Sequence, residues 1–310
     1  MKAVQYARYG GPDVLDYTDI ADPVPADDEV LIEVHAASVA PGDWKVRSGM
    51  LQHLFPVVLP TVPGRDGAGV VVAVGPKVDY AKVGDEVCFV TQHVEQGGAA
   101  ELVARGRHDI APKPANLSFT EATTIIHAGV CAWIGLVETA RIEAGQTVLI
   151  LGGSGSIGSL SVQLAKHLGA TVAATCHSRN ANYVAGLGAD TVIAYDRENF
   201  ADRLTEVDAV FDLVGGAMHE AAYGVVRKGG VIAWLIAKPF EDRSADFGVR
   251  DMQAVIEDRP DLTARVLDLA GQGILRPQVA RELPLADCAE AHRLMEAGAI
   301  SRGRIVLKVR

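Results

Sequence analysis

The spacing of apolar residues changes character once along the chain. In roughly the first hundred residues, short apolar runs alternate with turns that contain Gly and Pro, and few stretches have helical periodicity. This pattern is typical of a compact β domain with a barrel-like or rolled sheet. The runs that we predict to be strands are 1–6, 29–39, 67–74, 84–90 and 98–103.

Strands and helices alternate in the middle of the chain. Ser118 and Glu121 match a capping box at the start of a helix. The predicted strands from there on are 147–151, 171–176, 191–195, 208–214 and 230–237, and the predicted helices between them are 157–168, 180–187 and 217–227. This alternation predicts a parallel sheet with helices on both faces.

The C-terminal part returns to the style of the first domain. Residues 238–250 are polar and irregular, and we expect a surface excursion there. Helices are expected at 261–270 and 286–297, and a strand at 304–309. The fold class is therefore α/β. A β-rich domain over 1–115, completed by 275–310, accompanies a doubly wound parallel-sheet domain over 116–274.

A glycine-rich turn joins the strand 147–151 to the helix that follows it. Gly153, Gly155 and Gly158 fit the G-x-G-x-x-G pattern in the strand–helix context that the pattern requires. Small residues there let the backbone approach a pyrophosphate, whose charge then lies on the free N–H groups of the helix start. The turn predicts a bound dinucleotide.

The stretch about 20 residues beyond the turn bears on which dinucleotide binds, because an acid there usually holds the ribose hydroxyls of NAD. The segment 175–180 (Thr-Cys-His-Ser-Arg-Asn) contains no acid. Ser178 and Arg179 could bind and neutralise a 2′-phosphate, which favours NADP(H). The alternative is that Arg179 is a solvated arginine on a turn.

Composition narrows the function classes. The chain has 310 residues and a net charge of −10, which argues against a nucleic acid or an anionic membrane as partner. No segment approaches the roughly 18 uncharged apolar residues that a membrane span needs. The four cysteines have no C-x-x-C spacing. We therefore expect reduced thiols in a cytoplasmic protein, without a disulfide framework or a structural zinc.

Several short sequence segments, in the order in which they occur along the chain, resemble those of a known family. They are the segments 1–4, 41–49, 63–71, 97–101, 289–292 and 303–307. With the glycine turn, they resemble the zinc-independent quinone oxidoreductases of the medium-chain dehydrogenase/reductase superfamily over effectively the full length. The resemblance implies a GroES-like catalytic domain, a Rossmann domain and a cleft between them. It also implies a homodimer, often joined through the last Rossmann strand, here Gly230–Ala237.

The motif and the resemblance together assign cofactor contacts. In related enzymes a tyrosine matching Tyr195 lies near the adenosine, and a basic residue near the C-terminus, here Arg302 or Arg304, often reaches the phosphates. The cofactor-binding candidates are Cys131, Gly152, Gly153, Ser154, Gly155, Ser156, Ile157, Gly158, Ser178, Arg179, Tyr195, Asp212, Leu213, Val214, Leu235 and Arg304.

No metal is expected. Where zinc-bearing relatives have ligands, this chain has Ala40, Arg65 and His127. Alanine cannot ligate, and Arg65 places a positive charge where a cation would lie, so a tetrahedral site cannot form. Without a Lewis acid for an alkoxide, the prediction shifts from an alcohol dehydrogenase to a reductase.

The expected reaction is hydride transfer from NADPH to a quinone or to the β-carbon of an enone. No catalytic side chain is identified, and water is the default proton source. The candidates near the substrate are Asp43, Trp44, Arg65 and His127. Arg65 or His127 could hold the substrate carbonyl, or Arg65 could pair with Asp66 or Asp43 while His127 has only a structural role.

Two other functions stay open at this stage. One is an enone or enal double-bond reductase on the same fold. The other is an NADPH-binding protein with a structural or regulatory role and little turnover. The glycine turn would be intact in all three cases, so the turn cannot distinguish them.

Overall fold

The computed structural model describes residues 1–236, 240–257 and 259–310. These residues form two compact units. Unit 1 falls within 1–127, 258–271 and 277–310, and unit 2 within 128–257 and 272–276. The helices near 119–127 and 260–271, which the sequence had assigned to the Rossmann domain, thus pack with the β-rich part of the chain.

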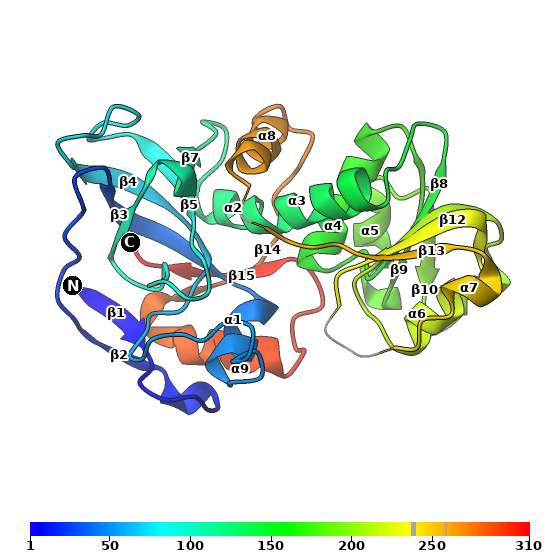
Figure 1. The fold of residues 1–310 in the computed structure, drawn as a ribbon, viewed down its shortest axis with the longest axis horizontal. Helices are drawn as coiled ribbons and strands as arrows, with labels where there is room; N and C mark the ends of the chain where they lie inside the picture. The colour runs from blue at the N-terminus through cyan, green and yellow to red at the C-terminus, as the bar shows by residue number, and fades with distance from the viewer. Residues whose placement is uncertain (237–239, 258) are drawn as a thin grey trace. The chain divides into compact units, whose positions relative to one another are not determined.

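Unit 1 is built from strands and a few short helices (Figure 1). Its strands are β1 (Lys2–Gln5), β2 (Asp16–Asp19), β3 (Val30–Val39), β4 (Asp66–Val74), β5 (Glu86–Val90), β6 (Leu102–Arg105), β7 (Ile110–Pro112), β14 (Val279–Pro284) and β15 (Arg304–Lys308). Its helices are α1 (Pro41–Arg47), α2 (Phe119–Thr123), α8 (Pro260–Gly271) and α9 (Cys288–Glu296).

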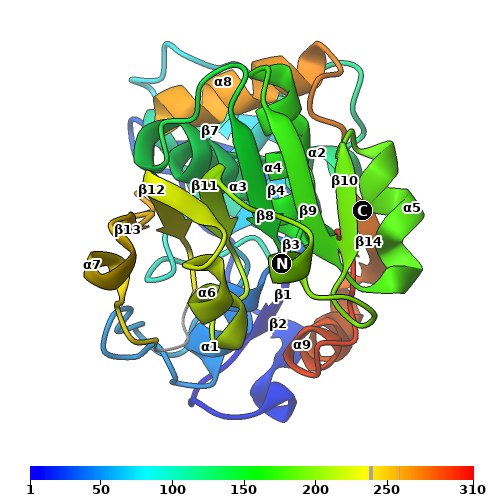
Figure 2. The ribbon, with the colours of Figure 1, turned by 90° about the vertical axis from the view of Figure 1, so that its right-hand side faces the viewer.

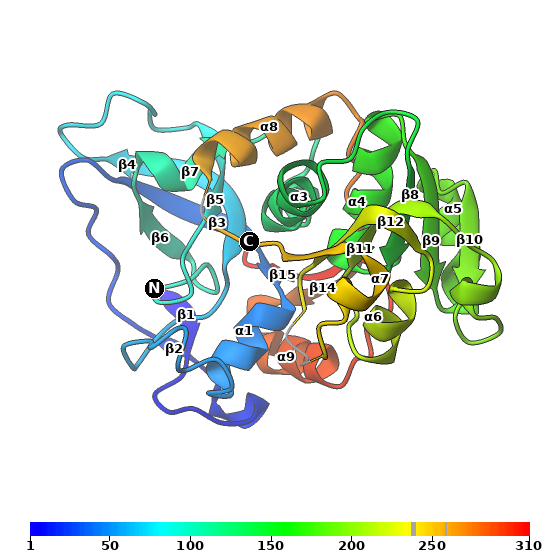
Figure 3. The same cartoon turned by 45° about the vertical axis from the view of Figure 1, so that its right-hand side comes forward.

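The main sheet of unit 1 joins the two ends of the chain. Its strands run in the order β14-β15-β3-β4-β5-β7, and β6 also pairs with β3. The C-terminal β15 lies antiparallel to β3 and parallel to β14, beside which Figure 3 draws it. The sequence predicted a strand at 98–103, but β6 begins at Leu102, and β14 was not predicted.

The core of this sheet forms because alternate residues of β3 face inward. Val30, Ile32 and Val34 are buried and pack with Phe89. The Phe89 ring lies directly over Gly67, where a Cβ would come within 2.1 Å of it. Phe89 therefore belongs to the core of this sheet.

Helix α3 (Ile126–Trp133) follows α2 and continues into the π-helical segment η3 (Ile134–Thr139). The capping box predicted at Ser118 is present, with Ser118 Oγ accepting the Glu121 N–H at 3.2 Å. By length and composition the helical stretch Phe119–Thr139 could cross a membrane, which corrects the expectation that no segment comes close. However, 72% of its most apolar window is buried, as in a core helix.

Unit 2 alternates strands with helices. Its strands are β8 (Thr147–Leu151), β9 (Thr171–Cys176), β10 (Thr191–Ala194), β11 (Val207–Asp212), β12 (Val226–Trp234) and β13 (Arg250–Gln253). Its helices are α4 (Ser156–His167), α5 (Ala181–Gly186), α6 (Ala217–Ala222) and α7 (Ser244–Phe247), with short 3₁₀ turns η4 (Ser178–Asn180) and η5 (Phe200–Asp202).

All strand pairs of the unit 2 sheet are parallel, in the order β10-β9-β8-β11-β12-β13 (Figure 2). In sequence terms this is the 3-2-1-4-5-6 order of a doubly wound dinucleotide-binding sheet. The chain reverses its direction of winding between β8 and β11. This confirms the predicted Rossmann fold class.

The edge of the sheet differs from the prediction. The described part of the predicted strand Gly230–Ala237 is mostly β12, while Ala237 lies outside the described residues. Strand β13 pairs along the outer side of β12, so β12 is not a free edge that could join a partner subunit. The expected surface excursion at 238–250, of which 238 and 239 are not described, contains α7 and leads into β13.

Candidate functional site

The predicted cofactor residues of unit 2 gather at one edge of its sheet. Because the strands are parallel, their carboxyl ends meet at the same edge, and ligands of such sheets bind there, where the winding reverses. The ends of β8 and β11 flank that point (Figure 2). The glycine turn follows β8, Ser178 follows β9, Tyr195 follows β10 and Leu235 follows β12.

The glycine turn is held tightly against β9. Gly152 has a φ of +87°, a left-handed conformation that favours glycine. Thr175 anchors the turn, because its Oγ1 accepts the Gly152 N–H at 3.0 Å and its carbonyl accepts the Gly153 N–H at 2.8 Å. A Cβ on Gly158 would lie 2.1 Å from the Gly152 carbonyl oxygen, so only glycine lets α4 start this close to β8.

The beginning of α4 offers donors without partners from the protein. No side chain caps this helix, and the first N–H groups of any helix lack intrahelical acceptors. Ser156 Oγ is buried and has no hydrogen-bond partner among residues 1–236, 240–257 and 259–310. Of the atoms in that part of the chain, a Cβ at Gly155 would meet only the Gly152 carbonyl oxygen, at 3.5 Å. These features fit a pyrophosphate on the helix N-terminus.

An acid that sequence analysis missed lies beside the end of β9. Asp196, which follows β10, accepts hydrogen bonds from Ser178 N at 2.6 Å and from Ser178 Oγ at 2.7 Å. The Ser178 hydrogen bond lowers the pKa of Asp196, although partial burial opposes it. Asp196 is therefore a carboxylate at neutral pH. The prediction of NADP(H) assumed that no acid is present at this point.

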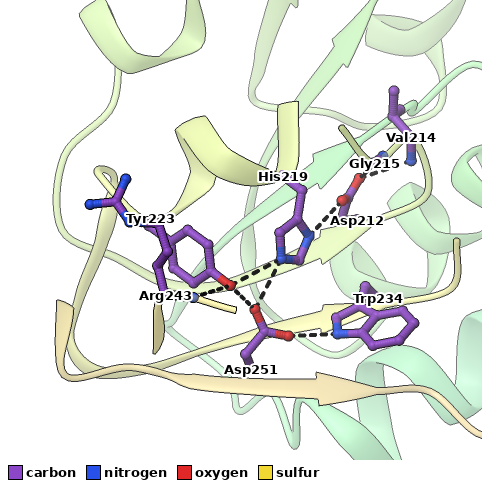
Figure 4. Close-up of polar contacts among 8 residues, drawn as sticks. All are labelled: Asp212, Val214, Gly215, His219, Tyr223, Trp234, Arg243 and Asp251. Carbon is purple, nitrogen blue, oxygen red and sulfur yellow. Dashed lines mark hydrogen bonds and ion pairs between the residues drawn. The ribbon is translucent and has the colours of Figure 1, made fainter. Parts of the chain in front are cut away.

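A buried polar network fixes the loop after β11 (Figure 4). Asp212 Oδ1 accepts the N–H groups of Val214 and Gly215 at 2.8 and 3.0 Å. Asp212 Oδ2 lies 2.9 Å from His219 Nδ1, and His219 Nε2 lies 2.9 Å from Asp251 Oδ2. Both oxygens of Asp212 thus have partners within the chain, so Asp212 holds the loop that follows β11.

Asp251, on β13, connects this network to Trp234 of the neighbouring strand β12 and to Tyr223. Trp234 Nε1 donates to Asp251 Oδ1 at 2.5 Å, and the Tyr223 hydroxyl donates to Asp251 Oδ2. Burial lowers the pKa of His219, but its hydrogen bonds to Asp212 and Asp251 outweigh burial and raise it to about 9. His219 is therefore a buried imidazolium between two carboxylates.

Asp43, a candidate of unit 1, caps the helix on which it lies. Its Oδ2 accepts the Ala40 N–H at 2.7 Å at the start of α1. Burial raises the pKa of Asp43 to about 7, although the Ala40 hydrogen bond opposes the shift. Its Oδ1 lies 4.0 Å from Nδ1 of His93, whose pKa is lowered to about 3 by burial and by the charge of Arg65. Asp43 and His93 line a small pocket of unit 1.

Arg304, assigned to cofactor phosphates, lies in a buried ion pair. Its side chain is 3% exposed, and its Nη1 donates to Asp66 Oδ2 and, at 3.1 Å, to Ser38 Oγ. This placement inside the unit 1 sheet argues against contact with a phosphate. Asp66 is therefore an ion partner of Arg304.

The remaining candidates are His127, Cys131 and Trp44. His127 is on α3, and its pKa is well below the usual range because of burial and the charges of Arg65 and Arg304. Among the described residues, no group of three or more His, Cys, Asp or Glu side chains could hold a metal ion. Cys131 is also on α3 and is buried, and Trp44 is half-buried on α1.

Three site residues escaped sequence reasoning, namely Asp196, His219 and Asp251. Each is a polar residue whose partner lies 7 to 32 positions away in the chain. Asp196 directly follows Tyr195, so the end of the third predicted strand was the available signal. Nothing in the polar sequence around Asp251 indicates a strand or a buried partner.

Family models match the chain in two parts. A model described as "Alcohol dehydrogenase GroES-like domain" matches residues 26–152, and one described as "Zinc-binding dehydrogenase" matches residues 187–307. Both parts of the predicted fold thus have counterparts in known families.

Individual proteins of known sequence or structure also resemble the chain. A 2-methylene-furan-3-one reductase of Solanum lycopersicum is 42% identical over 76% of this chain and 62% of its own length. An NADPH-dependent alkenal/one oxidoreductase of Arabidopsis thaliana is 42% identical over the same shares, so the chain spans 62% of each plant protein. The solved structure of a quinone oxidoreductase from Coxiella burnetii matches 100% of this chain and 99% of its own, with 31% identity and a TM-score of 0.88.

Replacing Gly155 tests the open side of the turn. Because a Cβ at Gly155 meets nothing closer than 3.5 Å, Gly155→Ala should melt within a few degrees of the wild type. We expect at least a 10-fold weaker dinucleotide affinity, measured by calorimetric titration, because the methyl group would fill the space for the pyrophosphate. Gly186→Ala, where a Cβ meets nothing within 4 Å, is the control and should bind normally. Equal affinity of both variants would contradict this site.

The pKa of His219 predicts how stability depends on pH. The folded pKa of about 9 is above the unfolded value of about 6.5. The stabilisation from the imidazolium is therefore complete below pH 6.5 and is lost as pH rises through 9. Denaturant titrations should show the free energy of unfolding falling over this range. His219→Gln should be less stable at pH 6 by about 3–5 kcal/mol, and this slope should disappear; an unchanged slope would refute the assignment.

Proposed function

The chain belongs to the zinc-independent quinone oxidoreductase family of the medium-chain dehydrogenases/reductases, and we propose that it transfers hydride from a reduced nicotinamide dinucleotide to a quinone or a conjugated carbonyl. The main support for this proposal is the arrangement of groups at the start of α4. There an uncapped helix, an open Gly155 and the unpartnered Ser156 Oγ lie together after the first strand of a doubly wound sheet.

The residues of unit 2 would bind and orient the dinucleotide. The first turn of α4 would hold the pyrophosphate through backbone N–H groups. The Asp212 network fixes the loop Leu213–Gly216, which lies at the switch point beside the turn. When bound, the nicotinamide supplies the hydride, and the contribution of the protein is placement of the acceptor close to it.

Some observations support the prediction that the dinucleotide is NADP(H), and one observation argues against it. Arg179 is exposed next to Ser178 in the chain, and the Arabidopsis relative is named NADPH-dependent. Asp196 opposes it, because this carboxylate already accepts both Ser178 donors. The homodimer and the cytoplasmic location also stay predictions.

The acceptor class follows from the names of the relatives. The tomato relative is named for a furanone with a conjugated methylene group, the Arabidopsis relative for alkenals and enones, and the Coxiella structure for quinones. In all three, hydride addition to a conjugated system gives an enolate or quinol anion that then takes a proton. We therefore propose one reduction chemistry for both acceptor classes.

A panel assay tests this function. Oxidation of NADH and of NADPH is followed by absorbance with quinones, enals and enones, and the reverse reaction with secondary alcohols and NAD(P)⁺. We expect turnover with at least one conjugated acceptor, none with the alcohols, and at least 10-fold slower turnover in Gly155→Ala at subsaturating dinucleotide. Tight dinucleotide binding without turnover on any acceptor would instead favour a structural or regulatory role, and stoichiometric zinc with alcohol oxidation would refute the zinc-free reading.

A further inference from the structure

Asp196 and Ser178 come together because their strands are neighbours. Strands β9 and β10 pair in parallel, with Cys176 opposite Ala194. The residues that follow these ends, Ser178 and Asp196, therefore meet at the carboxyl edge of the sheet. The Asp196 carboxylate takes the Ser178 N–H with one oxygen and the Ser178 O–H with the other.

This pair lies at the carboxyl ends of β9 and β10, the second and third strands of the sheet in chain order. Doubly wound sheets hold the adenosine ribose near the end of the second strand. A 2′-phosphate carries about −1.5 to −2 charges and only accepts hydrogen bonds at neutral pH. An ionised carboxylate likewise only accepts them. Asp196 and a 2′-phosphate would therefore compete for the donors of Ser178 and repel each other, whereas the hydroxyls of an unphosphorylated ribose can donate to the carboxylate.

The neighbouring cations do not remove the charge of Asp196. His177 Nδ1 lies 3.7 Å from Asp196 Oδ2, which is too far for a hydrogen bond, and this nitrogen faces the Arg179 N–H at 3.3 Å. Arg197 Nε lies 4.0 Å away on a side chain that is 74% exposed. Solvent screens so exposed a pair strongly.

We propose that Asp196 selects the dinucleotide, so that the site takes NADH in preference to NADPH. The inference rests on the proposed function and adds which form of the hydride donor this site uses. Asp196 acts here as a specificity residue at the ribose, distant in role from the reacting atoms. The acid needed for this choice comes from the end of the third strand, and the end of the second strand supplies the serine that holds it.

The test is the ratio of kcat/KM for NADH to that for NADPH, measured with one quinone, in the wild type and in Asp196→Asn. Asparagine keeps the size and can still accept from Ser178, but it removes the charge and adds donors. We expect the wild type to prefer NADH by at least 10-fold and the variant to lower this ratio by 10- to 100-fold. Asp196→Ser should change the ratio in the same direction.

Asp202→Asn is the matched control. Asp202 is an exposed acid of η5 in the same unit, and its substitution removes the same charge without touching Ser178. The control should keep the wild-type ratio. A wild-type preference for NADPH, or a ratio that Asp196→Asn and Asp202→Asn change equally, would overturn the proposal.

Direct binding separates this proposal from the proposed function. Dissociation constants of NAD⁺ and NADP⁺, measured by calorimetry on the same variants, need no acceptor and no turnover. A binding preference for NAD⁺ that Asp196→Asn reduces would support the selection by Asp196 even if no quinone is reduced. Equal binding of both dinucleotides by the wild type would overturn the selection even if quinones are reduced.

Discussion

The close approach of helix α4 to the end of β8 is the constraint on which the candidate site depends. The Gly152 carbonyl oxygen lies where a side chain on residue 158 would be, so the approach requires glycine there. Thr175 holds the turn from the neighbouring strand through two hydrogen bonds. Together these contacts point the uncapped start of α4 at the switch point of the sheet, where the first N–H groups lack intrahelical acceptors and Ser156 Oγ has no partner among the described residues.

A second constraint keeps the other side of the switch point in place. The charges of Asp212, His219 and Asp251 are buried together, which costs solvation and is tolerable only because each is paired and hydrogen-bonded. The three residues belong to β11, α6 and β13. The network thus couples the edge strand to the loop beside the glycine turn, and losing His219 would leave the two carboxylates buried without a compensating charge.

The sequence was sufficient where a local pattern determines the structure. β8 and β9 have the predicted bounds, and the Gly153–Gly158 turn joins β8 to α4 as expected. β13 was missed because Arg-Asp-Met-Gln has no apolar alternation, and its register depends on pairing with β12. Arg304 was assigned to phosphates because a basic residue near the C-terminus often reaches them in related enzymes, but Asp66 holds it inside the sheet. Asp196 could be placed beside Ser178 only once the strand order was known.

The central claim is that the start of α4 binds the pyrophosphate of a dinucleotide. Amide hydrogen exchange of residues 152–158, with and without saturating NADH, tests it most directly. The account predicts that exchange slows at the amides of Ser156, Ile157 and Gly158, because the bound phosphates would accept these otherwise unpaired N–H groups. Unchanged exchange at these amides, while calorimetry shows NADH bound, would contradict it.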